Sequence, residues 1–150
     1  MDAVSYPESS VVQFISENLI PLRIQTDTEP YVSNFKLRWT PTLIILDPRG
    51  EERQRTVGFL QPEELIPALL LGIGKVDFDM GCYVESIERF NRIITDYPDC
   101  EVAPEAVYLR GVANYKKDGT PQALKEAYEK LGSDYPGSIW AKRSAPYRLL

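Results

Sequence analysis

The chain has 150 residues, 43% hydrophobic and 26% charged, which is enough apolar material for a packed core under a polar surface. Its formal net charge of −5 opposes binding to a nucleic-acid backbone, which requires clustered Lys and Arg. The sequence contains no histidine, which excludes imidazole bases, Ser–His and Cys–His pairs and histidine metal ligands. No apolar run is long enough to cross a bilayer, and the N-terminus has no signal-peptide pattern, so we expect a cytoplasmic protein that does not enter a membrane.

The period of the apolar residues changes along the first forty positions of the chain. Residues 9–18 have apolar side chains at helical spacing, which predicts an amphipathic helix with a serine as its N-cap. In residues 20–24 apolar residues alternate with Pro21 and Arg23, which predicts a strand with Pro21 near its start or on an edge. A short helix is expected over residues 30–35, because proline is tolerated in a first helical turn.

A β-hairpin and a long helix are predicted next. Residues 42–46 form a continuous apolar run rich in β-branched side chains, which suits a strand buried on both faces. Residues 47–50 read Asp-Pro-Arg-Gly, a turn sequence because proline presets φ and glycine accepts a positive φ. Residues 52–57 would then pair antiparallel with the first strand. A helix is expected to begin at Pro62 and to be kinked at Pro67.

Residues 1–74 resemble the thioredoxin fold without its first strand. The resemblance rests on the run Trp39-Thr40-Pro41-Thr42, on the Asp-Pro-Arg-Gly turn, on Val57-Gly58 and on the helix start at Pro62. It implies that Thr40 and Pro41 form the cis-proline loop, whose backbone pairs with an extended substrate segment. An ordinary trans proline at the start of a strand is the alternative. Trp39 either packs in the core or against a strand, or it forms a wall of a peptide groove.

The sequence contains no Cys-x-x-Cys motif, which the resemblance would place roughly forty residues before the cis-proline, at or just before Met1. Either the sequence starts at an internal methionine of a longer oxidoreductase, or the chain is a natural derivative without the motif. The first strand is central in the family, so its loss would leave residues 20–24 and 42–46 unpaired. Because unpaired edges recruit partners, we expect a homo-oligomer, a rearranged sheet or marginal stability.

Residues 75–150 have the pattern of a helical region with an internal repeat. The dipeptide Tyr-Pro occurs at Tyr97-Pro98 and again at Tyr135-Pro136, and each copy separates two helical stretches. This arrangement resembles tetratricopeptide repeats, which implies stacked pairs of helices. The region holds fewer repeats than the roughly three that an independent solenoid needs, so we expect it to pack on the first half or on a second subunit.

The two cysteines, Cys82 and Cys100, are too far apart in the sequence for a redox motif or a zinc site. Cys100 takes the place that Ser138 has in the second repeat, so it is a turn or cap residue or, alternatively, a thiol activated at a helix N-terminus. Cys82 is interpreted as a small buried side chain. The charged residues of positions 51–55 are interpreted as solvated surface, and Asp47 as a turn residue before a candidate acid.

The sequence therefore predicts an incomplete α/β thioredoxin-like domain over residues 1–74, followed by all-α tetratricopeptide-like hairpins over residues 75–150. The leading hypothesis is a non-catalytic module that binds a protein or peptide at Trp39, Thr40, Pro41 and Thr42, with a further interface on the helices. The alternative is a thioredoxin-family thiol–disulfide oxidoreductase without its active-site segment. Because that chemistry needs an attacking thiolate, the chain as written should not reduce disulfides. No metal and no cofactor is expected.

Overall fold

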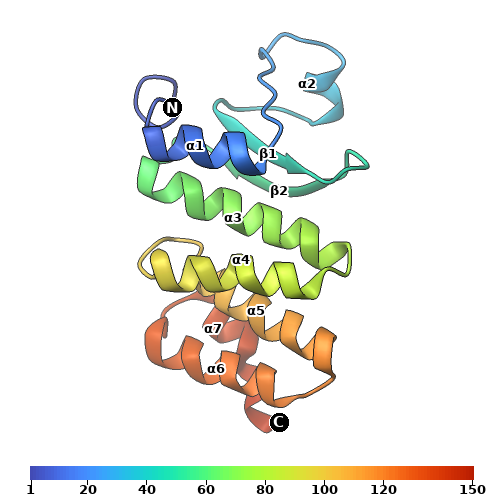
Figure 1. Ribbon diagram of the computed structural model, residues 1–150, viewed down its shortest axis with the longest axis vertical. Coiled ribbons are helices and arrows are strands. Elements are labelled where there is room, and N and C mark those ends of the chain that lie inside the picture. Colours follow the sequence, from blue (N-terminus) through green and yellow to red (C-terminus); the bar gives the residue numbers. More distant parts are fainter.

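The computed structural model describes residues 1–150 and has a small β-hairpin at one end and stacked helices beyond it (Figure 1). In chain order the elements are α1 (Ser9–Asn18), α2 (Tyr31–Asn34), β1 (Thr42–Leu46), β2 (Glu52–Val57), α3 (Pro62–Asp79), α4 (Tyr83–Asp96), α5 (Ala103–Asp118), α6 (Gln122–Asp134), α7 (Ile139–Ser144) and the 3-10 helix η1 (Ala145–Leu149). None of the helices has the length and apolar composition needed to cross a membrane.

The sheet consists of β1 and β2 alone, which pair antiparallel with Thr42 opposite Val57 and an irregularity between Ile45 and Leu46. Both strands have the predicted bounds, because the turn sequence between them fixes the hairpin locally. The expectation that β1 is buried on both faces is wrong. Ile45 is buried, whereas Leu46 is exposed, because only the face toward α3 is packed.

Residues 20–24 do not form the predicted strand. The segment lies outside helices and strands, and Ile20 and Leu22 are 98% and 76% exposed. Period-2 alternation is a local property, but a strand also needs a neighbour whose backbone pairs with it, and no such neighbour lies within residues 1–150. The predicted serine N-cap of α1 is also wrong, because Glu8 takes the N-cap position without a side-chain hydrogen bond.

Helix α3 lies between the hairpin and α4 and forms the centre of the molecule (Figure 1). Two glycines allow this close packing, since a Cβ at Gly72 would lie 2.6 Å from Cγ1 of Ile45 and one at Gly74 would lie 2.6 Å from Cε1 of Phe90. One core cluster accordingly joins residues of both halves, including Ile45 and Phe90. Pro67 lies inside α3 without ending it, and the predicted domain boundary at residue 74 falls within this helix.

Each helix from α3 to α6 packs against the next one in the chain. The two Tyr-Pro turns of this region have nearly the same backbone: Tyr97 has φ −135° and ψ 51°, and Tyr135 has φ −134° and ψ 50°. In both turns the tyrosine N–H donates to the carbonyl of the residue four positions earlier, Ile93 or Leu131. The two tyrosines of the repeated dipeptide therefore share one backbone conformation and one helix-ending hydrogen bond.

Candidate peptide-docking site

The residues Trp39, Thr40, Pro41 and Thr42 form one tight loop that leads into β1. The Thr42 hydroxyl donates to the Trp39 carbonyl oxygen at 2.6 Å, which closes the loop on itself. The N–H of Gly58, at the end of β2, donates to the Pro41 carbonyl oxygen at 2.9 Å. The Thr40–Pro41 bond is cis. This is the form that the resemblance implies, and the alternative of an ordinary trans proline is wrong. The structure thus holds all four predicted residues in one place.

Trp39 projects away from the core, with 73% of its surface exposed. Of its two interpretations, core packing is therefore wrong, whereas a role as a groove wall stays a prediction. Two further apolar side chains, Val57 and Phe59, flank Gly58 and are about half exposed. Sequence reasoning missed Phe59, although its position next to Val57-Gly58, which the resemblance had singled out, was a signal.

The edge of β1 that faces away from β2 is open. Because Pro41 accepts from Gly58, the backbone groups of Pro41 point toward β2, and in an extended strand those of Leu43 and Ile45 do the same. The N–H and C=O groups of Thr42 and Ile44 therefore point to the other edge, where no strand pairs with them. Such an edge is a template for an additional extended chain.

Two cations precede the loop without a carboxylate partner. Lys36 and Arg38 are exposed, and neither forms an ion pair within 4.0 Å. The backbone of Lys36 has φ 50°, the left-handed conformation that lets the chain turn out of α2. The candidate docking loop thus lies beside local positive charge on a protein that is acidic overall.

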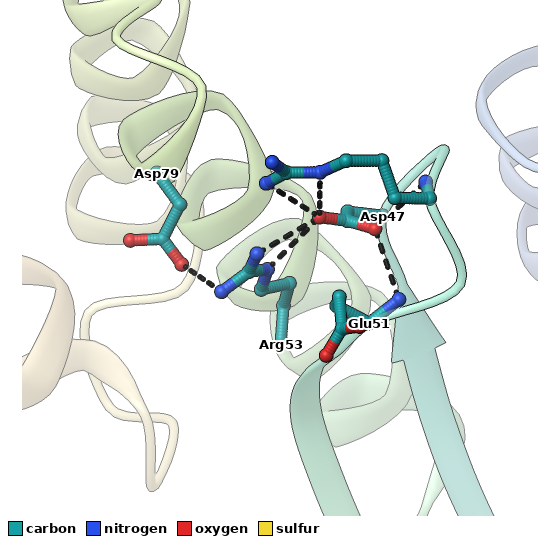
Figure 2. Close-up of polar contacts among 5 residues, drawn as sticks. Asp47, Glu51, Arg53 and Asp79 are labelled. Atoms are coloured by element: carbon teal, nitrogen blue, oxygen red, sulfur yellow. Dashed lines mark hydrogen bonds and ion pairs between the residues drawn. The ribbon is translucent and has the colours of Figure 1, made fainter.

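At the opposite end of the hairpin, Asp47 is the centre of a polar network (Figure 2). One carboxylate oxygen accepts from the N–H of Arg49 at 2.8 Å and of Glu51 at 3.0 Å. The other accepts from the Arg53 guanidinium at 2.9 Å, and Arg53 also pairs with Asp79 at 3.1 Å. Because Asp79 ends α3, the network fixes the turn of the hairpin to the end of that helix.

This network explains why Asp47 is not a candidate acid. The hydrogen bond from Arg53 is the main cause that holds the pKa of the Asp47 carboxyl well below its ordinary value, and the two backbone N–H groups lower it further. A carboxylate that stays ionised and is surrounded by donors cannot supply a proton. The interpretation of Arg53 as solvated surface is wrong, since only 22% of its side chain is exposed and it pairs with two carboxylates.

The two cysteines lie apart from the docking loop and are both free thiols. Cys100 lies in the turn between α4 and α5 and is half-buried, and burial raises the pKa of its thiol despite backbone hydrogen bonds that lower it. Burial thus opposes the thiol activation considered for Cys100, whose role as a reactive group stays a prediction. The expectation that Cys82 is buried is wrong: the turn at Gly81 leaves Cys82 exposed at the N-cap of α4.

Comparison with family models gives a match in the first half of the chain. Residues 7–72 match the family model of a thioredoxin-like domain. The match extends from just before α1 into α3 and includes the docking loop, so this part of the chain is similar to a thioredoxin-like domain. No curated protein and no solved structure matches the chain significantly.

Proposed function

We propose that the chain is a non-catalytic binding module whose thioredoxin-like half takes up an extended segment of a protein or peptide partner. The observation that carries the proposal is the exposure of Trp39 beside the open edge of β1. A large aromatic side chain at 73% exposure is a typical anchor in peptide recognition. An unpaired strand edge next to it offers backbone hydrogen bonds to an extended chain.

The partner's chemistry follows from the side chains around the loop. The backbone of the partner would pair with the free backbone groups of Thr42 and Ile44, and these hydrogen bonds do not depend on the partner's sequence. Trp39 and Phe59 would contact apolar side chains on alternate positions of the partner. The unpaired Lys36 favours a partner that carries an acidic residue next to its apolar ones. The proposed ligand is therefore an extended, apolar segment with an acidic flank.

The helices would supply a second interface. We propose that α4 to α7 are tetratricopeptide-like hairpins, which is supported by the shared backbone conformation of the turns at Tyr97 and Tyr135. Stacked helical pairs present extended surfaces on which other proteins bind. The two free cysteines are compatible with a reducing compartment, which favours the cytoplasm as the place of binding.

The match of residues 7–72 to a thioredoxin-like domain also supports the alternative, a thiol–disulfide oxidoreductase whose active-site cysteines lie outside this sequence. An insulin-reduction assay with dithiothreitol on this chain tests the binding module, and the same assay on a chain that includes any segment encoded in frame before residue 1 tests the alternative. The binding module should show no activity above the blank, because disulfide exchange requires an attacking thiolate in an accessible redox pair. Activity that persists in a Cys82→Ser, Cys100→Ser double variant would contradict both proposals.

Binding itself is tested by selecting ligands from a library of extended peptides and measuring the best one by calorimetry. Trp39→Ala should weaken its binding by about tenfold or more, since a buried aromatic anchor contributes at least about 1.4 kcal/mol. The matched control is Tyr115→Ala, which removes an exposed aromatic side chain from α5. Equal effects of the two substitutions, or none of Trp39→Ala, would contradict docking at the loop.

A further inference from the structure

Arg55 joins the hairpin to the segment that leads into the docking loop. From β2 its guanidinium donates a hydrogen bond to the carbonyl oxygen of Phe35 at 2.8 Å. Phe35 is the C-cap of α2 and precedes Trp39 by four positions. We propose that Arg55 is a positioning residue of the docking site: by holding Phe35, it sets the place of Trp39 against the hairpin. This inference rests on the proposed docking of a peptide at Trp39.

Residues 25–40 form a lobe around α2 that stands away from the stacked helices (Figure 1). No residue of α2 is buried, and α2 packs against no other helix or strand. The hydrogen bonds within the lobe are local, such as the bond from the Leu37 N–H to the Val32 carbonyl oxygen at 3.0 Å. The bond from Arg55 is the one hydrogen bond that joins the lobe to β2. A single side chain thus makes the polar connection.

A bulge in β2 brings a carboxylate to Arg55. Side chains alternate between the two faces of a regular strand, so residues 52 and 55 would point to opposite faces. A regular ladder would also place Leu46 opposite Arg53, but Leu46 pairs with Glu52 instead. The extra residue shifts the alternation at this point, and the Glu52 carboxylate forms an ion pair with Arg55.

Glu52 fixes the orientation of the guanidinium. Nε of Arg55 donates to Oε1 of Glu52 at 2.7 Å, and a terminal nitrogen donates to Oε2. Two such bonds to one carboxylate hold the planar group in a single orientation, and the same terminal nitrogen reaches Phe35. The hydrogen bond from Arg55 is the main cause that lowers the pKa of Glu52, so this carboxylate is ionised at neutral pH. A lysine could not make this set of bonds, because it lacks the planar fork.

The hold on Phe35 is transmitted to Trp39 through a fixed turn. Lys36 has the left-handed φ of 50°, so the chain leaves α2 in a defined direction. On the other side of Trp39, the Thr42 hydroxyl binds its carbonyl oxygen at 2.6 Å. Arg55 and Thr42 therefore restrain the chain before and after the aromatic anchor. A partner that meets a restrained anchor loses less conformational freedom on binding, which increases its affinity.

Calorimetry with the selected peptide tests this role. Arg55→Met removes the guanidinium but keeps an unbranched stem, and it should weaken binding by about threefold or more. In a Trp39→Ala background the same substitution should have little further effect, because Arg55 acts through Trp39. Equal weakening in both backgrounds would mean that Arg55 acts on overall stability alone, and would overturn the proposal.

Two further variants control for charge and for the shape of the side chain. Arg49→Met removes the same charge from the opposite end of the hairpin, where 70% of the Arg49 side chain is exposed, and should leave the affinity unchanged. Arg55→Lys keeps the charge without the fork and should recover only part of the affinity. Full recovery by Arg55→Lys, or equal losses in Arg49→Met and Arg55→Met, would show that charge alone matters.

The motion of Trp39 gives a second readout that needs no peptide. In a Trp140→Phe background Trp39 is the only tryptophan, and its fluorescence anisotropy decay reports motion on the nanosecond scale. Arg55→Met should increase the amplitude of the fast decay, whereas Arg49→Met should not. An unchanged decay in Arg55→Met overturns the positioning role, with circular dichroism as the check of folding.

The two measurements separate this inference from the proposed function. If Trp39→Ala weakens peptide binding and Arg55→Met does not, the positioning role is wrong and peptide docking stands. If Trp39→Ala has no effect on binding, docking at the loop is wrong, and the anisotropy decay alone decides whether Arg55 holds Trp39 in place.

Discussion

The hydroxyl of Tyr135 donates a hydrogen bond to the carbonyl oxygen of Pro98, 2.8 Å away, so the second Tyr-Pro turn is tied directly to the first. The two residues lie 37 positions apart in the sequence but occupy equivalent turns, one after α4 and the other after α6. Burial is the main cause that raises the pKa of the Tyr135 hydroxyl, so it remains a donor over the ordinary pH range.

Tyr135→Phe should therefore destabilise the helical half by about 1 kcal/mol, the net contribution of a typical hydrogen bond, measured by urea unfolding. Tyr128→Phe is the matched control, because the Tyr128 side chain is half-buried on α6 and its hydroxyl makes no hydrogen bond within the chain. Its unfolding free energy should change little. An equal loss in both variants would indicate that ring packing rather than the bond to Pro98 links the turns.

The crossing of α5 and α6 should depend on the absence of a side chain at Gly111. A Cβ there would lie 2.5 Å from the Cβ of Ala127 and 3.1 Å from the backbone oxygen of Ala123. We expect Gly111→Ala to destabilise the protein despite its better helix propensity, because overpacking costs about 1–3 kcal/mol and the propensity gain is only about 1 kcal/mol.

Gly132→Ala is the control for this prediction, because Gly132 also lies in a helix but a Cβ there would meet nothing within 4 Å. It should stabilise the protein by about 0.5–1 kcal/mol in thermal or urea unfolding. Adding Ala127→Gly to Gly111→Ala should recover part of the lost stability, since it removes the atom that clashes. A stabilising effect of Gly111→Ala alone would show that α5 and α6 lie further apart.

Asp47→Asn should loosen the hairpin from α3, because an amide cannot replace the charge that binds Arg53. The sign of the pH dependence follows from the depressed pKa of Asp47. Its contribution to stability is complete above the unfolded-state pKa of about 3.9 and is lost as the pH falls toward the lower pKa of the folded state. The stability difference between wild type and Asp47→Asn should therefore shrink in acid.

Thermal melts across the acid range measure this difference, and Glu51→Gln is the control. Glu51 forms its hydrogen bond to Asp47 through the backbone N–H, so changing its side chain leaves that bond intact. A constant difference between wild type and Asp47→Asn down to strong acid would mean that the ion pair with Arg53 contributes no charge-dependent stability.

The parts of the fold that were predictable from the sequence are those specified by neighbours in the chain. The bounds of β1 and β2 followed from one turn sequence, and the Tyr-Pro dipeptides marked the ends of α4 and α6. Residues 20–24 failed as a strand because pairing depends on a partner elsewhere. The role of Arg53 was missed for the same reason, since Asp79 lies at the end of another element.

The docking loop illustrates the same limit at the candidate site. Its position and its cis bond at Pro41 followed from the family resemblance, which encodes a local motif. The exposure of Trp39 did not follow, because burial depends on which elements cover a side chain after folding. The exposure of the Cys82 side chain depends on the turn at Gly81. The apolar periodicity of the helix that follows gives no information about that turn.

The two thiols should differ in reactivity, and Cys82 should react faster. The helix N-terminus near Cys100, taken alone, would suggest the reverse order. Cys82 is exposed, whereas burial raises the pKa of Cys100 and so lowers its thiolate fraction near neutral pH. Alkylation of the native protein followed by mass spectrometry should show several-fold faster labelling of Cys82. As the pH rises toward the raised pKa of Cys100, labelling of Cys100 should increase. In urea the two labelling rates should converge, which is the control for intrinsic reactivity. Faster labelling of Cys100 than of Cys82 in the native protein would instead show that the Cys100 thiol is activated.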